Sequence, residues 1–277
     1  MTSILTQPRP GSIVFVGGGQ MAMALVAGLI KADLSPEAIT VVEPDASQRA
    51  RVIETFGIDS VGEAAGCRKT AEVVIWAVKP QVMRAAVLQS IDCFPGALHV
   101  SIAAGITTST LVEWLKSQRI IRAMPNTSAL IGAGVTGLVA SAEVTQADRM
   151  VGEALLGATG HCFWVERDDR LNAVTAVSGS GPAYVFYFLE AFQRGAQSLG
   201  FNEQQARDLV LKTAAGALAQ AGLGDAFDTL RTRVTSKGGT TQAALEALDA
   251  ANVSQAIEAA MHAASQRSKA MAGEFAR

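Results

Sequence analysis

The sequence lacks an excess of charge of either sign. Its 277 residues include 23 basic and 25 acidic side chains, which give a formal net charge of −2 at pH 7. These charges are spread along the chain and form no basic stripe. Because nucleic acids and anionic membranes attract clustered Lys and Arg, neither is expected as a partner.

Cysteines and targeting signals are also scarce. Cys67, Cys93 and Cys162 are odd in number, widely spaced and never in a C-x-x-C arrangement, which predicts reduced thiols rather than disulfides or metal ligands. The N-terminal "MTSILTQPRP" lacks the basic start and apolar stretch of a signal peptide. No apolar run approaches the roughly 20 residues of a membrane helix. We therefore expect a soluble, cytoplasmic protein without a metal.

What the sequence does contain is a regular alternation in its first part. Apolar runs predict strands at 12–16, 40–42, 71–78, 97–105, 119–123, 134–140 and 161–165. Helical spacing of apolar residues predicts helices at 21–32, 45–56 and 107–116. This alternation indicates the α/β class, with an N-terminal Rossmann-type doubly wound, mostly parallel sheet.

The pattern changes after Glu166. Helices are predicted at 171–177, 183–199, 203–221, 226–234, 240–248 and 254–271, with no alternating β-branched run among them. The chain is 49% hydrophobic and long enough for two domains. We predict a dinucleotide-binding Rossmann domain at 1–166 and an all-helical domain at 167–277.

The stretch "IVFVGGGQMAMALVAGL" predicts a dinucleotide loop. Gly17, Gly19 and Ala22 have the G-x-G-x-x-A spacing between a strand and a helix. The first glycine permits the turn, the second lets the backbone approach a pyrophosphate, and Ala22 lets helix pack on strand. Glu43 follows Ala22 by 21 residues at the end of the second strand, where an acid binds an adenosine ribose. Together these residues predict a nicotinamide dinucleotide.

The residues leave the choice between NADH and NADPH open. A carboxylate at Glu43 favours the 2′-hydroxyl of NADH and repels the 2′-phosphate of NADPH. Arg49 and Arg51 in the following helix either bind such a phosphate or are solvated.

Two further segments follow strand ends, where an open α/β sheet places its ligand. In "AVKPQ", Lys79 is either a charge at the mouth of the cleft or an exposed lysine that begins a helix. In "RAMPNTS", Asn126 either borders the nicotinamide or belongs to a plain turn. The predicted cofactor-binding residues are Gly17, Gly19, Gln20, Met21, Ala22, Glu43, Ala77, Val78, Lys79, Pro80 and Asn126.

Two glycine-containing helix starts lie in the helical part. In "TSKGGTTQAALEAL", two glycines and two threonines open an amphipathic helix, so free N–H groups and the positive end of the helix dipole form an anion site. The stretch "VSGSGPAYVFYFLEA" places serines, glycines and a proline before an apolar helix, as at a capped helix start.

Five motifs together resemble those of one known family. "VGGGQMA", "AVKPQ", "MPNTS", "VSGSGPAYV" and "VTSKGGTT" are similar, in order and approximate spacing, to those of pyrroline-5-carboxylate reductase. The resemblance implies reduction of the cyclic imine 1-pyrroline-5-carboxylate to L-proline with NADPH or NADH, the last step of proline biosynthesis. It also implies a homodimer through the helical domain, with dimers often assembled further into rings.

The resemblance also implies roles for residues of the helical domain. In the segment 236–241, the backbone N–H groups of Gly238, Gly239 and Thr240 would hold the substrate carboxylate, and the Thr241 hydroxyl would hydrogen-bond the ring nitrogen as the catalytic contact. Two serines of the earlier motif would shape the pocket. The implied substrate-binding residues are Ser178, Ser180, Ser236, Gly238, Gly239, Thr240 and Thr241.

The sequence departs from the family pattern at three points. Ser128 stands where "NTP" has proline, "LIGAG" lacks an acid often found there, and Lys237 replaces the proline usual in "TSPGGT". Unlike proline, lysine does not fix φ, and its side chain adds a positive charge. Lys237 is either a solvated neighbour of the loop or a charge that draws in the anionic substrate.

Two other functions compete with this prediction. A β-hydroxyacid dehydrogenase carries a catalytic lysine with an asparagine four residues later, whereas Lys212 and Lys269 are followed at that distance by glycine. A non-catalytic dinucleotide-sensing protein would keep the glycine loop without turnover, and the intact Thr240 and Thr241 argue against it. None of the three histidines is expected to act as a general acid.

Overall fold

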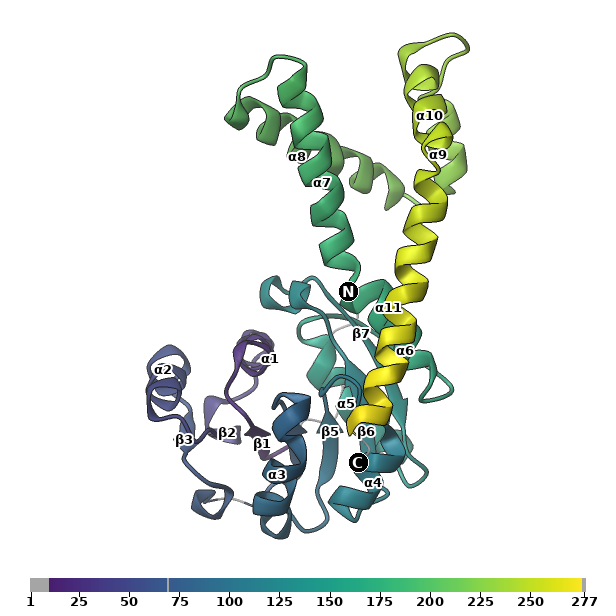
Figure 1. The fold of residues 1–277 in the computed structure, drawn as a ribbon. Coiled ribbons are helices and arrows are strands. Elements are labelled where there is room, and N and C mark those ends of the chain that lie inside the picture. The colour runs from purple at the N-terminus through teal and green to yellow at the C-terminus, as the bar shows by residue number, and fades with distance from the viewer. Residues whose placement is uncertain (1–9, 69, 276–277) are drawn as a thin grey trace. The chain divides into compact units, whose positions relative to one another are not determined.

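The computed structural model describes residues 10–68 and 70–275. Within these residues, eight strands form one sheet in the order β3-β2-β1-β4-β5-β6-β7-β8 (Figure 1). Neighbouring strands are parallel, except that β6 and β7 are antiparallel. The predicted class is confirmed. The strands are β1 (Ile13–Val16), β2 (Ile39–Val42), β3 (Asp59–Val61), β4 (Val73–Trp76), β5 (Leu98–Ser101), β6 (Ile120–Met124), β7 (Gly134–Ala140) and β8 (Gly160–Trp164).

Helices connect the strands and then continue alone to the end of the chain. A one-turn π-helix, η6 (Thr175–Gly179), separates α6 from α7. The helices are α1 (Gln20–Lys31), α2 (Ala46–Phe56), α3 (Pro80–Ser90), α4 (Thr108–Leu115), α5 (Gln146–Gly157), α6 (Arg170–Val174), α7 (Gly181–Ser198), α8 (Glu203–Ala221), α9 (Phe227–Arg233), α10 (Thr240–Ala250) and α11 (Val253–Phe275).

Two apolar cores cover the opposite faces of the sheet. Phe15 of β1 lies in one core with side chains of α1, α2 and α5, and Val14 lies in the other with side chains of α3 and α4. Successive residues of a strand point to opposite faces, so a strand buried on both faces is apolar throughout. This explains why β1 and β4 have four fully apolar, buried residues each.

Among the strands and α-helices, β3 and α5 were not predicted from the sequence, and α3 was only one of two alternatives for the residues after Lys79. β3 has three residues that are half-buried or exposed, so it lacks an apolar run. α3 buries Met83, Val87 and Ser90, at the i, i+4 and i+7 spacing of a helix. α5 begins with a capping box of Thr145 and Asp148, a signal that the sequence does carry.

The described chain forms two compact units. The first contains the sheet and the chain up to Ser180, together with the end of α11 from Ala264, and the second is Gly181–Ala263. The predicted boundary after Glu166 follows the end of the sheet. However, α6 packs on β7 through Leu171 and Val174, so it is part of the first unit.

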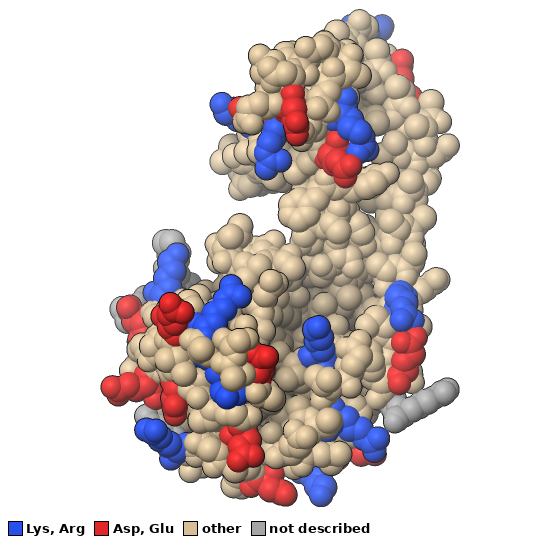
Figure 2. Space-filling view, turned by 60° about the vertical axis from the view of Figure 1, so that its left-hand side comes forward, with Lys and Arg blue, Asp and Glu red and all other residues tan. Residues whose placement is uncertain are grey.

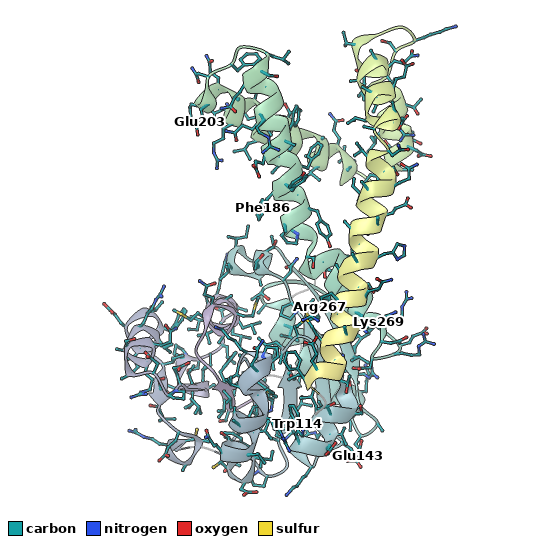
Figure 3. The ribbon with its side chains drawn as sticks, viewed as in Figure 1. Trp114, Glu143, Phe186, Glu203, Arg267 and Lys269 are labelled. Carbon is teal, nitrogen blue, oxygen red and sulfur yellow. The ribbon has the colours of Figure 1, made fainter. Side chains whose placement is uncertain are left out.

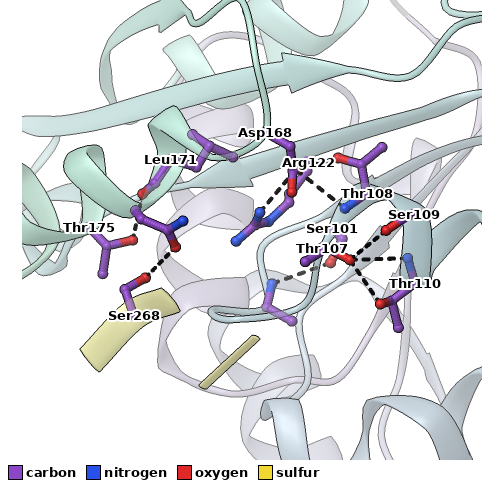
Figure 4. A network of polar contacts seen from close by, with 12 residues as sticks. Ser101, Thr107, Thr108, Ser109, Thr110, Arg122, Asp168, Leu171, Thr175 and Ser268 are labelled. Carbon is purple, nitrogen blue, oxygen red and sulfur yellow. Dashed lines mark hydrogen bonds and ion pairs between the residues drawn. The ribbon is translucent and has the colours of Figure 1, made fainter. Parts of the chain in front are cut away.

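The end of α11 is attached to the first unit by a buried polar contact. The Ser268 hydroxyl donates to Asn172 Oδ1 at 2.8 Å, and both residues are buried (Figure 4). A Cβ at Gly105 would lie 3.2 Å from Met271 Cβ, so the loop after β5 also meets this helix closely. The end of the last helix therefore packs on α6 and on the loop after β5.

Candidate active site

The carboxyl ends of β1 and β4 mark the point at which the strand order reverses. Helix α1 starts at Gln20 after β1, and α3 starts at Pro80 after β4. In doubly wound sheets, ligands bind in the crevice at this switch point. The predicted cofactor loop, residues 17–22, therefore lies where the fold places a nucleotide.

The glycine loop fits a pyrophosphate group. Gly17 has a φ of 101°, and a Cβ there would lie 2.7 Å from the Ala77 carbonyl oxygen, so the turn requires glycine. A Cβ at Gly19 would meet no atom of the described residues within 4 Å, which leaves space above the helix start. Gly19 is the N-cap of α1, and no side chain caps this helix. The first N–H groups of α1 are thus available to an anion.

Glu43 is held beside this loop. Its Oε2 accepts the Gly18 N–H at 2.9 Å, and its Oε1 accepts the Asp45 N–H at 3.0 Å. Arg49 Nη1 donates to the main-chain carbonyls of Glu43 and Pro44 at 2.8 and 2.7 Å. A carboxylate is therefore fixed at the end of β2, while the Arg49 guanidinium is bound by the backbone.

Lys79 and Pro80 join β4 to α3. Lys79 is exposed and is the N-cap of α3, and Pro80 is the first residue of that helix. Proline suits this position because its missing N–H has no partner there in any case. Lys79 thus begins a helix and also lies at the ligand-binding edge, so its contact with the cofactor, like that of Ala77 and Val78, stays a prediction.

Asn126 is tied to the motif around Ser178. It is 7% exposed; its Oδ1 accepts the Val135 N–H at 3.1 Å, and its Nδ2 donates to the Ser178 main-chain carbonyl at 2.9 Å. The structure therefore brings together two of the motifs singled out in the sequence. The prediction that Asn126 borders the nicotinamide stays a prediction, because its amide already has two partners in the protein.

The segment around Ser178 is a helix with one widened turn. The Ser180 N–H donates to the Thr175 carbonyl, five residues back, at 2.8 Å. The Ser178 hydroxyl donates to the Val174 carbonyl at 3.0 Å. Single π-turns are rare and occur often at functional sites. The two serines predicted to shape the substrate pocket flank the end of this turn.

A partly buried ionic network around Asp168 was not predicted from the sequence (Figure 4). Arg122 of β6 is 3% exposed, and its Nη1 donates to Asp168 Oδ1 at 3.0 Å. The same oxygen accepts the Thr108 N–H at 3.3 Å and the Thr108 hydroxyl. Asp168 thus joins the start of α4 to the strand that leads to Asn126. A lone arginine within an apolar strand was the signal in the sequence.

The segment 236–241 belongs to the second unit and is described by itself. Gly238 has a φ of 72°, and its N–H donates to Gln242 Oε1 at 2.7 Å. The Gly239 N–H donates to the Ser236 carbonyl at 3.0 Å. Helix α10 begins at Thr240 without a side-chain cap. Two of the three N–H groups predicted to bind a carboxylate therefore already have partners, whereas the first turn of α10 is open.

The side chains of this segment differ in exposure. Lys237 is exposed, and Thr241 is half-buried. The exposure of Lys237 favours the solvated alternative, while the roles of Ser236, Thr240 and Thr241 in substrate binding stay predictions.

Burial makes the interior titratable groups poor candidates for proton transfer. Burial, with a contribution from Arg119, lowers the pKa of His99 to about 4, and His99 Nδ1 accepts the Trp76 indole N–H at 3.2 Å. Burial raises the pKa of Cys67 to about 11 and that of Cys162 to about 12. These groups are neutral at pH 7 and structural. In the residues that the structure describes, no cluster of His, Cys, Asp and Glu is arranged to hold a metal ion.

The second unit exposes many large apolar side chains. Phe186 on α7 is 67% exposed (Figure 3), and Leu223 is 85% exposed. An apolar surface of this extent is typical of a protein interface. Other exposed members are Val185, Tyr187, Phe188, Phe192, Leu199, Leu218 and Phe227.

Two further surface properties agree with the composition. On the face drawn in Figure 2, basic and acidic side chains are interspersed. Among the described residues, no helix combines the length and the apolar character needed to cross a membrane.

The Tyr184 hydroxyl is buried and has no hydrogen-bond partner in the described part of the chain. Buried hydroxyls are normally hydrogen-bonded, so this group can still accept a hydrogen bond from, or donate one to, a ligand or another chain.

The glycine loop and the fixed acid, placed at the switch point of the sheet, are features of oxidoreductases that use a nicotinamide dinucleotide. A family model described as "NADP oxidoreductase coenzyme F420-dependent" matches residues 12–105, and one described as "Pyrroline-5-carboxylate reductase dimerisation" matches residues 168–271. A pyrroline-5-carboxylate reductase of Pseudomonas aeruginosa is 41% identical over 98% of this chain and 99% of its own length. That of Haemophilus influenzae is 42% identical over 94% and 97%. The chain belongs to the pyrroline-5-carboxylate reductase family.

Solved structures of the family have the same fold. A pyrroline-5-carboxylate reductase of Coxiella burnetii superposes with a TM-score of 0.88 at 34% identity and covers 94% of this chain and 98% of its own. The Plasmodium falciparum enzyme, solved with NADP bound, has a TM-score of 0.84 at 25% identity, with the same coverages. The likeness spans both compact units. The chain is accordingly an NAD(P)H-dependent enzyme that forms a homo-oligomer.

Proposed function

We propose that this chain reduces 1-pyrroline-5-carboxylate to L-proline in proline biosynthesis. The observation that carries this proposal is that the family likeness covers the nucleotide crevice and the helical region together. A dinucleotide held in the glycine loop would supply the hydride for the imine carbon and would be oxidised to NAD(P)⁺. The nitrogen ends with a proton, so C=N becomes CH–NH. An imine protonated before hydride transfer requires positioning rather than a general acid, in agreement with the neutral, buried His99.

The residues of the crevice would bind the dinucleotide. The open space at Gly19 and the uncapped start of α1 support binding of the pyrophosphate there. The backbone from Ala77 to Pro80 would border the nicotinamide half, since Ala77 lies directly beside Gly17. Adjacent parallel strands bring these two loops to one edge.

The segment 236–241 would hold the carboxylate of the imine. The Gly238 N–H donates to a side-chain oxygen, Gln242 Oε1, and is therefore directed at a position where an oxygen atom can bind. The start of α10 has no side-chain cap, so its first N–H groups are also donors for an anion. The substrate carboxylate would replace the Gln242 oxygen. The Thr241 hydroxyl would then hydrogen-bond the ring nitrogen.

We infer a preference for NADH. The Glu43 carboxylate is fixed beside Gly18, and Asp45 stands two residues later. Hydrogen bonds from the Ser47 hydroxyl and the Gln48 N–H lower the pKa of Asp45, so a second carboxylate stands close to that of Glu43 after β2. Both would repel a 2′-phosphate, and Arg49 is already bound to two carbonyls.

We further propose a homodimer formed through the second unit, with assembly into rings of dimers, in the cytoplasm. The exposed apolar side chains of α7 and α8 support the interface, and three free thiols support a reducing compartment. Light scattering on the wild type and on Phe186→Asp tests the interface. A monomeric wild type, or a variant with unchanged mass, would contradict it.

The function is tested by following nicotinamide absorbance with 1-pyrroline-5-carboxylate and each cofactor in turn. We expect oxidation with both cofactors, a higher kcat/KM with NADH, and L-proline as the product. Absence of imine-dependent oxidation with either cofactor would refute the proposed reaction. Equal or greater efficiency with NADPH would refute the preference alone.

A further inference from the structure

The Ser178 carbonyl needs a hydrogen-bond donor from outside its own helix. In an unbroken α-helix, this carbonyl would accept the N–H of the fourth residue ahead. That residue is Pro182, which has no N–H. Asn126 Nδ2 lies 2.9 Å from the carbonyl oxygen and supplies the missing donor.

The turn that contains this carbonyl is held by hydrogen bonds to the helical turn before it. Its widened shape depends on the bond from the Ser180 N–H to the Thr175 carbonyl at 2.8 Å. Gly179 packs closely on the end of β6, since a Cβ there would lie 3.1 Å from Met124 Cε. A change in the direction of the Ser178 carbonyl would therefore move the backbone of Ser178 and of Ser180.

Asn126 is itself fixed by the sheet. It follows β6 after Pro125 and is buried, and its Oδ1 accepts the N–H of Val135 in β7 at 3.1 Å. Its side chain thus links two strands of the sheet to the widened turn. An amide has both an acceptor and donors, so asparagine serves both bonds, whereas a carboxylate serves the first alone.

We propose that Asn126 is a positioning residue for substrate binding. It replaces the N–H that Pro182 lacks and thereby sets the shape of the widened turn Thr175–Gly179. This inference rests on the proposed role of Ser178 and Ser180 in the substrate pocket. The amide acts through that turn and requires no contact with the imine or with the nicotinamide, so this proposal is an alternative to the predicted contact of Asn126 with the cofactor.

The first test is Asn126→Asp, which keeps the size of the side chain and the acceptor for Val135 but removes the donor. Because an unpaired Ser178 carbonyl lets the turn relax, we expect KM for the imine to rise ~10-fold or more, with the Kd of NADH, from fluorescence titration, changed by less than about twofold. Ser128→Ala, on the same loop, is the matched control with unchanged kinetics. An unchanged KM, or an equal rise in the NADH Kd, would overturn the proposal.

The second test is rescue by Pro182→Ala, which restores a backbone N–H four residues after Ser178. In the Asn126→Asp background this change should lower KM for the imine at least ~3-fold, whereas in the wild type it should give no improvement. No rescue in a folded double variant would overturn the proposal. If Asn126→Asp alone fails to fold, the double variant must recover folding, and failure to do so counts equally against it. An inactive wild type would instead refute the proposed function.

Discussion

Two glycines of the dinucleotide loop should respond differently to substitution by alanine: one change should lower folding stability and the other should lower NADH affinity. At Gly17 the φ of 101° is unfavourable for alanine, and the new Cβ would lie 2.7 Å from the Ala77 carbonyl oxygen. Strain at such a φ costs on the order of 1–3 kcal/mol, and the carbonyl must also move. We expect Gly17→Ala to lower the free energy of unfolding by about 3 kcal/mol, or Tm by roughly 5–10 °C.

Gly19→Ala is the matched change in the same loop. Gly19 has φ −69° and ψ −178°, which alanine adopts, and its Cβ would meet no atom within 4 Å. Loss of a favourable N-cap residue and the smaller entropy of the unfolded chain nearly cancel, so stability should change by less than about 0.5 kcal/mol. The methyl group would fill the space for the pyrophosphate, and the Kd of NADH should rise ~10-fold or more.

Calorimetry without cofactor and fluorescence titration with NADH measure the two effects separately. Unchanged NADH affinity in a folded Gly19→Ala variant would show that the pyrophosphate does not cross this residue. A Gly17→Ala variant as stable as the wild type would show that the turn does not need its left-handed conformation.

Three further predictions follow from the site and the core. Thr241→Ala should lower kcat ~100-fold with little change in the Kd of NADH, because it would remove the proposed hydrogen bond to the imine nitrogen; equal loss of cofactor affinity would contradict this role. Glu43→Ser should shift the ratio of kcat/KM values toward NADPH by ~10-fold, and an unchanged ratio would mean that Glu43 does not face the ribose. Burial lowers the pKa of His99 in the folded protein to about 4 from the 6.5 of a free histidine, so the unfolded chain binds more protons below pH 6.5. The free energy of unfolding should therefore fall by about 2 kcal/mol from pH 7 to pH 5, and urea unfolding of His99→Gln should lack most of this loss; an equal loss in both proteins would exclude His99 as its cause.

Local patterns predicted much of the first unit. The buried strands β1 and β4 are apolar at every position, so their runs are visible without knowledge of the partner strands. The cofactor residues of the G-x-G-x-x-A loop and Glu43 could be recognised from their spacing along the chain alone. In contrast, β3 is half-buried and gives no such signal.

Contacts between distant segments could not be predicted in this way. Asn126 and Ser178 are 52 residues apart, and Arg122 and Asp168 are 46 apart. Each pair meets because the sheet places β6 beside the turn after β8. The sequence pointed to Asn126 as a residue near the cofactor, whereas its observed partners are two backbone groups.

The sequence by itself determined the class of fold, the dinucleotide loop and the family likeness, because these depend on residue type and spacing along the chain. The tertiary structure decided which polar groups have partners: the Glu43 carboxylate at Gly18, the Asn126 amide at Ser178, and the Gly238 N–H at Gln242. The physical reason is that a hydrogen bond depends on distance and direction within about 3 Å, and these are set only when the backbone has folded.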